Sequence, residues 1–158
     1  MRLFCFASRN IRNIQIGIKH QMWAVASVSD GAMAGRITKA QRYLRPGDFG
    51  VIYCNALHAF TTPFIVRSCA DPDKIEKDIW PEAWVLPFKI ETLGNLSRTV
   101  SKEASERWSI VRQRMANIQG RGGVSAAMNI TGTTVFVPVP ITQSDWDQIC
   151  GDLATNPC

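Results

Sequence analysis

Runs of apolar residues divide the chain into short segments, most of them typical of β-strands. The first run, RLFCFAS (2–8), is almost continuously apolar, so it predicts a strand buried on both faces. Further strands are predicted at MWAVASV (22–28), RPGDFGVIYC (45–54, a turn feeding a strand), HAFTTPFIVRSC (58–69), WVLPFKIETL (84–93) and TTVFVPVPI (133–141). Residues 55–58 then form a hairpin connection, and Pro87 predicts an edge position or a bulge.

Helical spacing of apolar residues predicts the remaining elements. Helices are predicted at 11–20, within 31–44, at 101–117 and at 142–153. Ser8 or Asn10 can cap the first of these helices, and Thr142 or Ser144 can cap the last, because short polar side chains accept hydrogen bonds from the first-turn N–H groups.

The length of 158 residues suits one domain, so we expect a single domain over 1–158. Strands mixed with segregated helices predict an α+β fold, with a curled β-sheet or small pseudo-barrel flanked by helices. No apolar run approaches the roughly 18 residues of a membrane span. The first run turns polar at Ser8, too early for a secretory signal. These features predict a cytoplasmic protein without a membrane partner.

The charge is distributed unevenly along the chain. Residues 1–45 carry eight Lys and Arg side chains against Asp30 alone, and residues 98–121 carry six against two acids. The segments 46–97 and 122–158 are net acidic. If the fold brings the two basic segments together, they form the positive face expected of a protein that binds a phosphate backbone. A surface charge that only keeps the protein soluble is the alternative.

Residue types for catalysis or metal binding are few. The five cysteines are widely scattered without a C-x-x-C pair, and only His20 and His58 are present as further ligands. This pattern argues against a metal site or a disulfide framework, and we expect no cofactor. The sequence lacks the G-x-S-x-G, Walker and H-E-x-x-H motifs, so we expect a non-catalytic binding domain.

A glycine-rich segment, QGRGGVS (119–125), ends the predicted helix at 101–117. Its glycines let a ligand approach the main chain closely, so backbone N–H groups and Arg121 can contact a phosphate. A flexible helix terminator explains the same residues.

Five tryptophans divide into two groups. Trp108 and Trp146 lie on predicted amphipathic helices, where core packing is expected. Trp23 precedes a strand, and Trp80 and Trp84 flank a proline in a polar loop. A large aromatic residue at such a position either plugs the end of a barrel or lines a pocket.

The segment LFCFASRNIRNIQIGIKHQMWAV (3–25) resembles the opening of the YTH and EVE domains, which belong to the PUA-like superfamily. These domains begin with an apolar strand ending in Ser, continue through an Asn-bearing segment into a helix, and place a Trp at the start of the next strand. The spacing from Ser8 to Trp23 matches YTH domains without a gap. The segment IWPEAWVLPFKIETL (79–93) resembles the YTH segment in which cage tryptophans precede a strand, and RPGDFGVIYC resembles an EVE turn.

This resemblance covers roughly residues 2–95 and implies an aromatic pocket for one modified nucleobase. It implies that Trp23 and Trp84 are cage walls, with Trp80 as a third wall or a lid, and that Asn13 hydrogen-bonds the base edge. Ser8 and Asn10 lie in the pocket rim, and phosphate contacts are expected at Arg9, Arg12, Lys19 and Arg121. Arg9 replaces an asparagine common in YTH domains, and Ala24 replaces a Ser or Thr, which leaves the identity of the base open.

We therefore expect a reader that flips a methylated base into a tryptophan cage. Asn13 and the YTH-like spacing slightly favour N6-methyladenine over 5-methylcytosine. Similar prokaryotic domains act as specificity modules of modification-dependent restriction systems, so methylated DNA is the expected ligand, with a fused or associated nuclease or AAA+ motor as partner. The alternatives are a reader of methylated RNA, a small ASCH-type hydrolase with a Lys or carboxylate in place of the tryptophans, and tryptophans that only plug the core.

Overall fold

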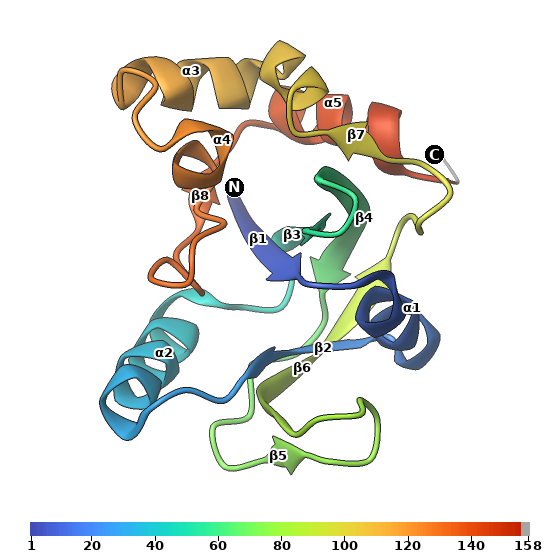
Figure 1. Ribbon diagram of the computed structural model, residues 1–158, viewed down its shortest axis with the longest axis vertical. Coiled ribbons are helices and arrows are strands. Elements are labelled where there is room, and N and C mark those ends of the chain that lie inside the picture. Colours follow the sequence, from blue (N-terminus) through green and yellow to red (C-terminus); the bar gives the residue numbers. More distant parts are fainter. Residues whose placement is uncertain (156–158) are drawn as a thin grey trace.

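In the computed structural model, which describes residues 1–155, a curled sheet forms the centre of the molecule and helices flank it (Figure 1). The strands are β1 (Arg2–Ser8), β2 (Met22–Ala26), β3 (Phe49–Cys54), β4 (Ala59–Val66), β5 (Ile75–Glu76), β6 (Trp84–Thr92), β7 (Val100–Ser101) and β8 (Val139–Pro140). The helices are α1 (Ile11–His20), α2 (Asp30–Tyr43), the 3-10 helix η1 (Ala104–Arg107), α3 (Ser109–Asn117), α4 (Gly123–Ala127) and α5 (Gln143–Leu153). The sheet has the order β2-β6-β4-β3-β1-β8, while β5 pairs with β6 and β7 with β4. The predicted α+β fold with a curled sheet and flanking helices is confirmed.

Two hydrophobic cores lie on the two sides of β1, because side chains alternate between the faces of a strand. Phe4 and Phe6 belong to the first core, which also contains residues of α1, α2, β2, β4 and β6. Leu3 and Cys5 belong to the second core, which contains residues of α3, α4 and α5. This alternation confirms the prediction that the first strand is buried on both faces.

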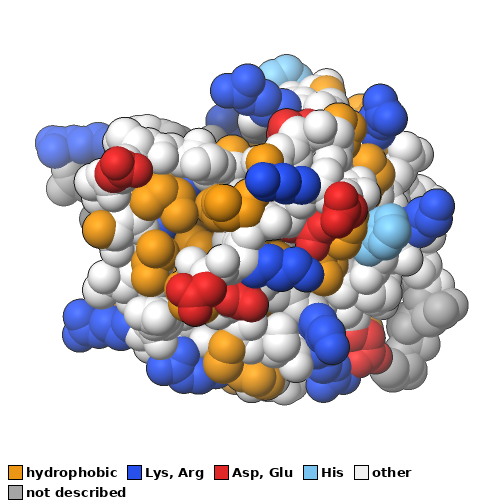
Figure 2. Space-filling view, turned by 90° about the horizontal axis from the view of Figure 1, so that it is seen from below, with side chains coloured by type: hydrophobic (Ala, Val, Ile, Leu, Met, Phe, Trp, Pro, Cys, Tyr) orange, Lys and Arg blue, Asp and Glu red, His pale blue; other side chains and the backbone are white. Residues whose placement is uncertain are grey.

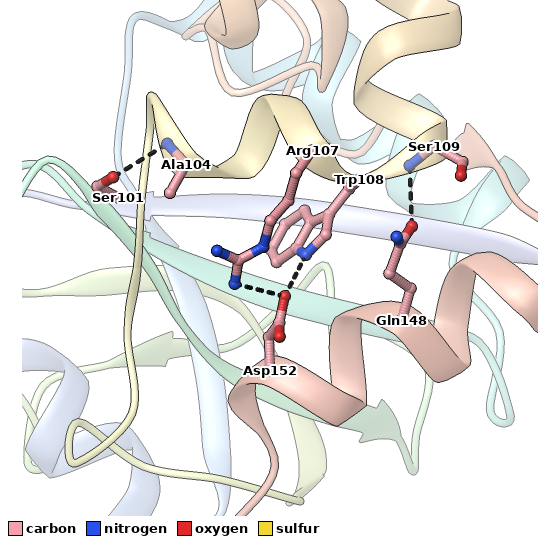
Figure 3. Close-up of polar contacts among 7 residues, drawn as sticks. All are labelled: Ser101, Ala104, Arg107, Trp108, Ser109, Gln148 and Asp152. Carbon is pink, nitrogen blue, oxygen red and sulfur yellow. Dashed lines mark hydrogen bonds and ion pairs between the residues drawn. The ribbon is translucent and has the colours of Figure 1, made fainter.

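The second core is fastened by polar contacts between η1, α3 and α5 (Figure 3). The indole N–H of Trp108 donates to Asp152 Oδ2 at 2.7 Å, and Arg107 Nη2 lies 2.9 Å from the same oxygen. The backbone N–H of Ser109 donates to Gln148 Oε1 at 2.8 Å. These bonds hold the start of α3 against the last two turns of α5.

The single helix predicted at 101–117 is wrong in its first half. Ser101 ends β7, and its hydroxyl accepts a hydrogen bond from the N–H of Ala104, where η1 begins. Trp108 then takes an extended conformation with φ −68° and ψ 133°, so α3 begins only at Ser109. Trp108 is fully buried and packs against Phe60, with ring centroids 5.2 Å apart. Tertiary packing of this indole therefore overrides the local helical pattern.

The strand predicted at 133–141 is also mostly wrong, because only Val139–Pro140 pairs with β1. Before it, the hydroxyls of Thr131 and Thr134 lie 2.8 Å apart, and Phe136 has a left-handed φ of 64°. Local side-chain hydrogen bonds of this kind offer the backbone an alternative to a strand ladder. The segment forms turns, and part of it lines the pocket described below.

The register of β6 against β2 is irregular. The pairs Trp23–Phe88 and Val25–Val85 leave one extra residue on β6. Leu86 adopts a left-handed φ of 56°, a conformation found at bulges. The irregularity predicted from the following proline is therefore confirmed as a bulge, and it bends β6 close to the beginning of the strand.

For two helices, one of the two predicted N-cap residues is confirmed. Asn10 caps α1, because its side chain accepts a hydrogen bond from the N–H of Asn13 at 2.8 Å. Thr142 caps α5 and forms a reciprocal capping box with Asp145. The short helix α4 follows the glycine-rich turn and was not predicted. Across residues 1–155, no helix is both long enough and apolar enough to cross a membrane.

Candidate functional site

A pocket of about 480 Å³ lies between β1 and β2, which are far apart in the order of the sheet. The curl of the sheet brings these strands near one another (Figure 1). The volume of the pocket falls within the range of about 300–1,000 Å³ that is usual for small-molecule pockets. The lining residues are Cys5 to Asn10, Asn13, Trp23 to Ala26, Arg36, Asn55, Glu82, Trp84, Ile130 to Gly132 and Val135.

Three tryptophans form one buried cluster at this pocket. The ring of Trp23 meets Trp84 edge-on, with centroids 5.3 Å apart and planes at 87°, and it meets Trp80 edge-on at 6.0 Å. Trp80 and Trp84 are stacked, with centroids 4.5 Å apart and planes at 7°. Trp23 and Trp84 line the pocket, whereas Trp80 does not. The structure thus brings together the predicted cage residues but presents only two of them to the pocket.

Trp80 lies behind the pocket wall. It is 2% exposed and covers one face of the Trp84 ring. Its indole N–H donates to the backbone oxygen of Asn13 at 3.1 Å, which ties the loop before β6 to α1. Trp80 therefore supports Trp84 and Asn13 from behind, which differs from the two roles expected from the sequence, a third wall or a lid.

Asn13 is buried and held through three of its polar groups. Its N–H donates to the cap Asn10, its carbonyl accepts from Trp80, and its side-chain Nδ2 donates to Glu82 Oε1 at 3.2 Å. A carboxylate can only accept hydrogen bonds when ionised, so the amide nitrogen of Asn13 is the atom that faces it. The side chain predicted to read the base edge therefore holds Glu82.

The indole N–H of Trp84 differs from the other polar groups of the cluster in its hydrogen bonding. Trp84 is 6% exposed, and its Nε1 atom is buried without a hydrogen bond of normal geometry. The same N–H lies close enough to Glu82 to lower the pKa of that carboxyl, together with Asn13 and Arg12, while partial burial opposes this shift. Glu82 is therefore ionised near neutral pH, and its carboxylate can accept a further hydrogen bond at the pocket wall.

Close packing against α1 fixes the position of Trp23. Gly17 lies so near this ring that a Cβ atom there would be 2.9 Å from Trp23 Cε3 and 3.0 Å from the carbonyl oxygen of Met22. Trp23 is 1% exposed and cannot move away easily. The glycine thus allows α1 to lie directly against the pocket tryptophan.

The other predicted site residues are divided between the pocket and the rest of the surface. Ser8, Arg9 and Asn10 line the pocket; the Ser8 hydroxyl donates to the backbone oxygen of Asn10 at 3.0 Å, and the Arg9 side chain is exposed. Arg12 and Lys19 are exposed on α1 outside the lining. Arg121 lies in the turn between α3 and α4, away from this pocket (Figure 1).

The two basic segments do not join into one face. Helix α1 packs on the first core and α3 on the second, so their basic residues lie on opposite sides of the sheet. On the face that Figure 2 shows, Lys and Arg side chains are interspersed with acidic and hydrophobic ones. Arg9 and Arg12 are therefore the predicted phosphate contacts nearest to the pocket, and Arg121 is separate from them.

Two charged lining residues, Arg36 and Glu82, were not among the predicted site residues. Arg36 of α2 donates to the backbone oxygen of Ala26 at 2.9 Å and lies 3.5 Å from the oxygen of Gly132, so it connects the end of β2 to the segment at 130–135. Burial lowers the pKa of Arg36. In the sequence, Arg36 falls within the helix predicted at 31–44 and Glu82 in the polar loop between Trp80 and Trp84. The polar loop between two tryptophans was the only local signal for Glu82.

Groups for catalysis or metal binding are sparse in the described residues. No cluster of His, Cys, Asp and Glu among residues 1–155 has the geometry of a metal site. Burial raises the pKa of the Cys5 thiol to about 12, which makes it a poor nucleophile. The hydrolase alternative requires a Lys or carboxylate in place of the tryptophans, but Trp23 and Trp84 line the pocket and Glu82 stands beside them.

Comparison with known proteins identifies the fold. No protein-family model and no curated protein matches the sequence. Among solved structures, the MmI1 YTH domain matches with a TM-score of 0.55 and 14% identity, over 96% of this chain and 93% of that chain. The YTH domain of Zygosaccharomyces rouxii MRB1 in complex with N6-methyladenosine RNA and the Pho92 YTH domain in complex with m6A each match with a TM-score of 0.51 and 19% identity, over 72% of this chain and 70% of theirs.

Coverage differs among the matches, and for another YTH-domain structure this chain spans 62% of the length of that chain. The resemblance seen in the sequence is confirmed at the level of the backbone: this chain has the curled α+β fold of the YTH domains.

Proposed function

We propose that this chain binds nucleic acid carrying a methylated base, and that the base enters the pocket between β1 and β2. The main support is the pair of buried indoles, Trp23 and Trp84, which line one pocket together with polar side chains. Stacking of a base on an indole contributes about 1–3 kcal/mol. Burying one methyl group adds roughly 0.8 kcal/mol, before shape complementarity is counted.

N6-methyladenine is the proposed base. The MRB1 and Pho92 YTH domains, which share the fold, were solved with N6-methyladenosine RNA and with m6A. These complexes support RNA as the nucleic acid that this chain binds. Methylated DNA is the second candidate, because the turn leading into β3 resembles the EVE pattern. On duplex DNA, extrusion of the base costs a few kcal/mol, which contacts of phosphates with Arg9 and Arg12 have to offset.

The proposed role is recognition without catalysis. If DNA is the ligand, we propose that the chain supplies specificity to a modification-dependent restriction system, with a nuclease or AAA+ motor as its partner. If RNA is the ligand, the chain acts as a reader of a methylated transcript. The pocket is the same in both cases, because the base and its methyl group make the contacts with Trp23 and Trp84.

A binding titration tests this proposal. RNA and DNA oligonucleotides of one sequence, single- and double-stranded, carry adenine, N6-methyladenine, cytosine, 5-methylcytosine or 5-hydroxymethylcytosine at one position. At fixed salt, we expect the N6-methyladenine strand to bind at least about fourfold more tightly than its unmodified counterpart, which corresponds to the roughly 0.8 kcal/mol of the buried methyl group. Equal affinity for all modified and unmodified oligonucleotides rejects the proposal. Comparison of the RNA with the DNA oligonucleotides shows which nucleic acid is the ligand.

A further inference from the structure

The carboxylate of Glu82 lines the pocket together with Trp84 and Asn13. Its residue is exposed, and its hydrogen bond is with the side chain of Asn13. It does not form any of the ion pairs found among the described residues. A carboxylate that a buried asparagine holds at the wall of a pocket is suited to accept a hydrogen bond from a ligand.

We propose that Glu82 reads the amino group of the bound base by accepting a hydrogen bond from its N–H. This inference rests on the proposed function and narrows its ligand class. The base has an exocyclic amine that keeps at least one hydrogen, as in N6-methyladenine, and a base with a fully methylated amine is rejected.

Two neighbouring polar groups, the side-chain amide of Asn13 and the indole N–H of Trp84, hold the carboxylate of Glu82. An ionised carboxylate has about four lone-pair positions, and Asn13 occupies one of them. The indole N–H of Trp84 also faces this carboxylate and, together with Asn13, lowers its pKa, so two groups of the fold hold Glu82 as an acceptor. A carboxylate held in this way complements a donor on the edge of the base. The N–H of a monomethylated exocyclic amine, as in N6-methyladenine, is such a donor, whereas a fully methylated amine has no hydrogen to donate.

This arrangement assigns a positioning role to Asn13. Its backbone is fixed by Asn10 on one side and by the Trp80 indole on the other, so its amide nitrogen holds Glu82 Oε1 in one place. The residue expected from the sequence to touch the base instead orients the carboxylate that touches it. A fixed acceptor binds the amino group more tightly than a mobile one, because less side-chain entropy is lost on binding.

The test compares a base that keeps the N–H with one that lacks it. Oligonucleotides carrying N6-methyladenine or N6,N6-dimethyladenine are titrated against the full chain and against Glu82→Gln. We expect the chain to prefer the monomethylated base about tenfold or more, because loss of a hydrogen bond to a charged group is costly. In Glu82→Gln this preference falls to within about threefold.

Steric rejection of the second methyl group gives a different result. A clash persists in Glu82→Gln, since the substitution keeps the size of the side chain, and the preference then stays at its value in the unmodified chain. That outcome overturns the inference while the preference for N6-methyladenine over adenine, measured alongside, still supports the proposed function. If the chain shows no preference between N6-methyladenine and adenine, both proposals fail.

Asp78→Asn is the matched control. Asp78 is an exposed acid of the same loop that does not line the pocket, so its substitution removes the same charge. We expect Asp78→Asn to change affinity for all strands equally and to keep the preference for the monomethylated base. If it loses that preference as Glu82→Gln does, a general change in charge explains the effect and the inference is overturned. Melting temperatures of both variants establish that they are folded.

Discussion

Trp108 and Trp84 are both buried, but their indole N–H groups differ in hydrogen bonding. In the second core, Trp108 donates to Asp152 at 2.7 Å, and Arg107 contacts the same carboxylate (Figure 3). At the pocket, the N–H of Trp84 is buried without a hydrogen bond of normal geometry. A buried donor without a partner costs about 1–3 kcal/mol. The fully satisfied indole belongs to the framework, whereas the indole N–H at the pocket lies near the Glu82 carboxylate without a hydrogen bond of normal geometry.

The largest effect is expected for Trp108→Ala. Removing this side chain leaves a cavity in the second core and takes a hydrogen-bond donor from Asp152, so the free energy of unfolding should fall by about 3–5 kcal/mol. Urea denaturation followed by circular dichroism measures the loss. At a temperature where the variant is folded, its preference for the methylated strand should be unchanged. A changed preference would mean that the second core and the pocket are coupled.

The next effect concerns binding. Trp84→Ala removes one stacking surface, so affinity for the methylated strand should fall about 10- to 100-fold, in line with about 1–3 kcal/mol for one stacked base. Trp146→Ala is the control, because Trp146 is also 6% exposed but belongs to the second core. Both variants are expected to be less stable, and only Trp84→Ala should lose the preference for the methyl group. Equal losses of binding would identify Trp84 as a core plug.

A smaller effect separates the two indole N–H groups directly. In Trp108→Phe the Asp152 carboxylate loses its donor, whereas in Trp84→Phe an unpaired donor is removed. The loss in the free energy of unfolding should therefore be larger for Trp108→Phe by about 1–2 kcal/mol. Chemical denaturation of the two variants at one pH gives this difference. Equal losses would show that the N–H of Trp84 finds a partner in solution.

The smallest effect is the response to acid. Burial raises the pKa of Asp152, but hydrogen bonds from Trp108 and Arg107 and the charge of Arg98 outweigh it, so the pKa is lowered. The resulting stability is present above the unfolded pKa of about 3.9 and is lost as the pH falls through the lower folded value. Asp152→Asn should flatten the stability profile below about pH 4, and Glu82→Gln should change it little because Glu82 is exposed. Urea midpoints measured between neutral and acid pH test this order.

Local patterns predicted most of the fold, because strand alternation and caps depend on neighbouring residues. The cap at Asn10 and the bulge at Pro87 are examples. Where long-range packing decides, the patterns failed: burial of Trp108 interrupts a helical repeat, and turns replace the strand expected around Phe136.

The candidate site was predicted in part for the same reason. Trp23 and Trp84 were found through a resemblance in spacing, and they do line one pocket. The contact of Asn13 with Glu82 joins residues 69 positions apart, so no local pattern reveals it. Arg36 reaches the pocket from a helix whose own sequence is unremarkable for binding. The roles of Asn13 and Trp80 as supports also depend on contacts that only the folded chain makes.

The pairing of β1 determines when the pocket can form during translation. Strand β1 carries part of the pocket wall, but its edge is completed only by Val139 and Pro140, which are made last among the strands. Its other neighbour, β3, runs parallel to it and is also distant along the chain. Contacts of such long sequence separation form slowly, because a large loop must close first. A nascent chain therefore cannot complete the edge of β1 until residues 139–140 have emerged from the ribosome, and fragments that stop before residue 139 should bind no base.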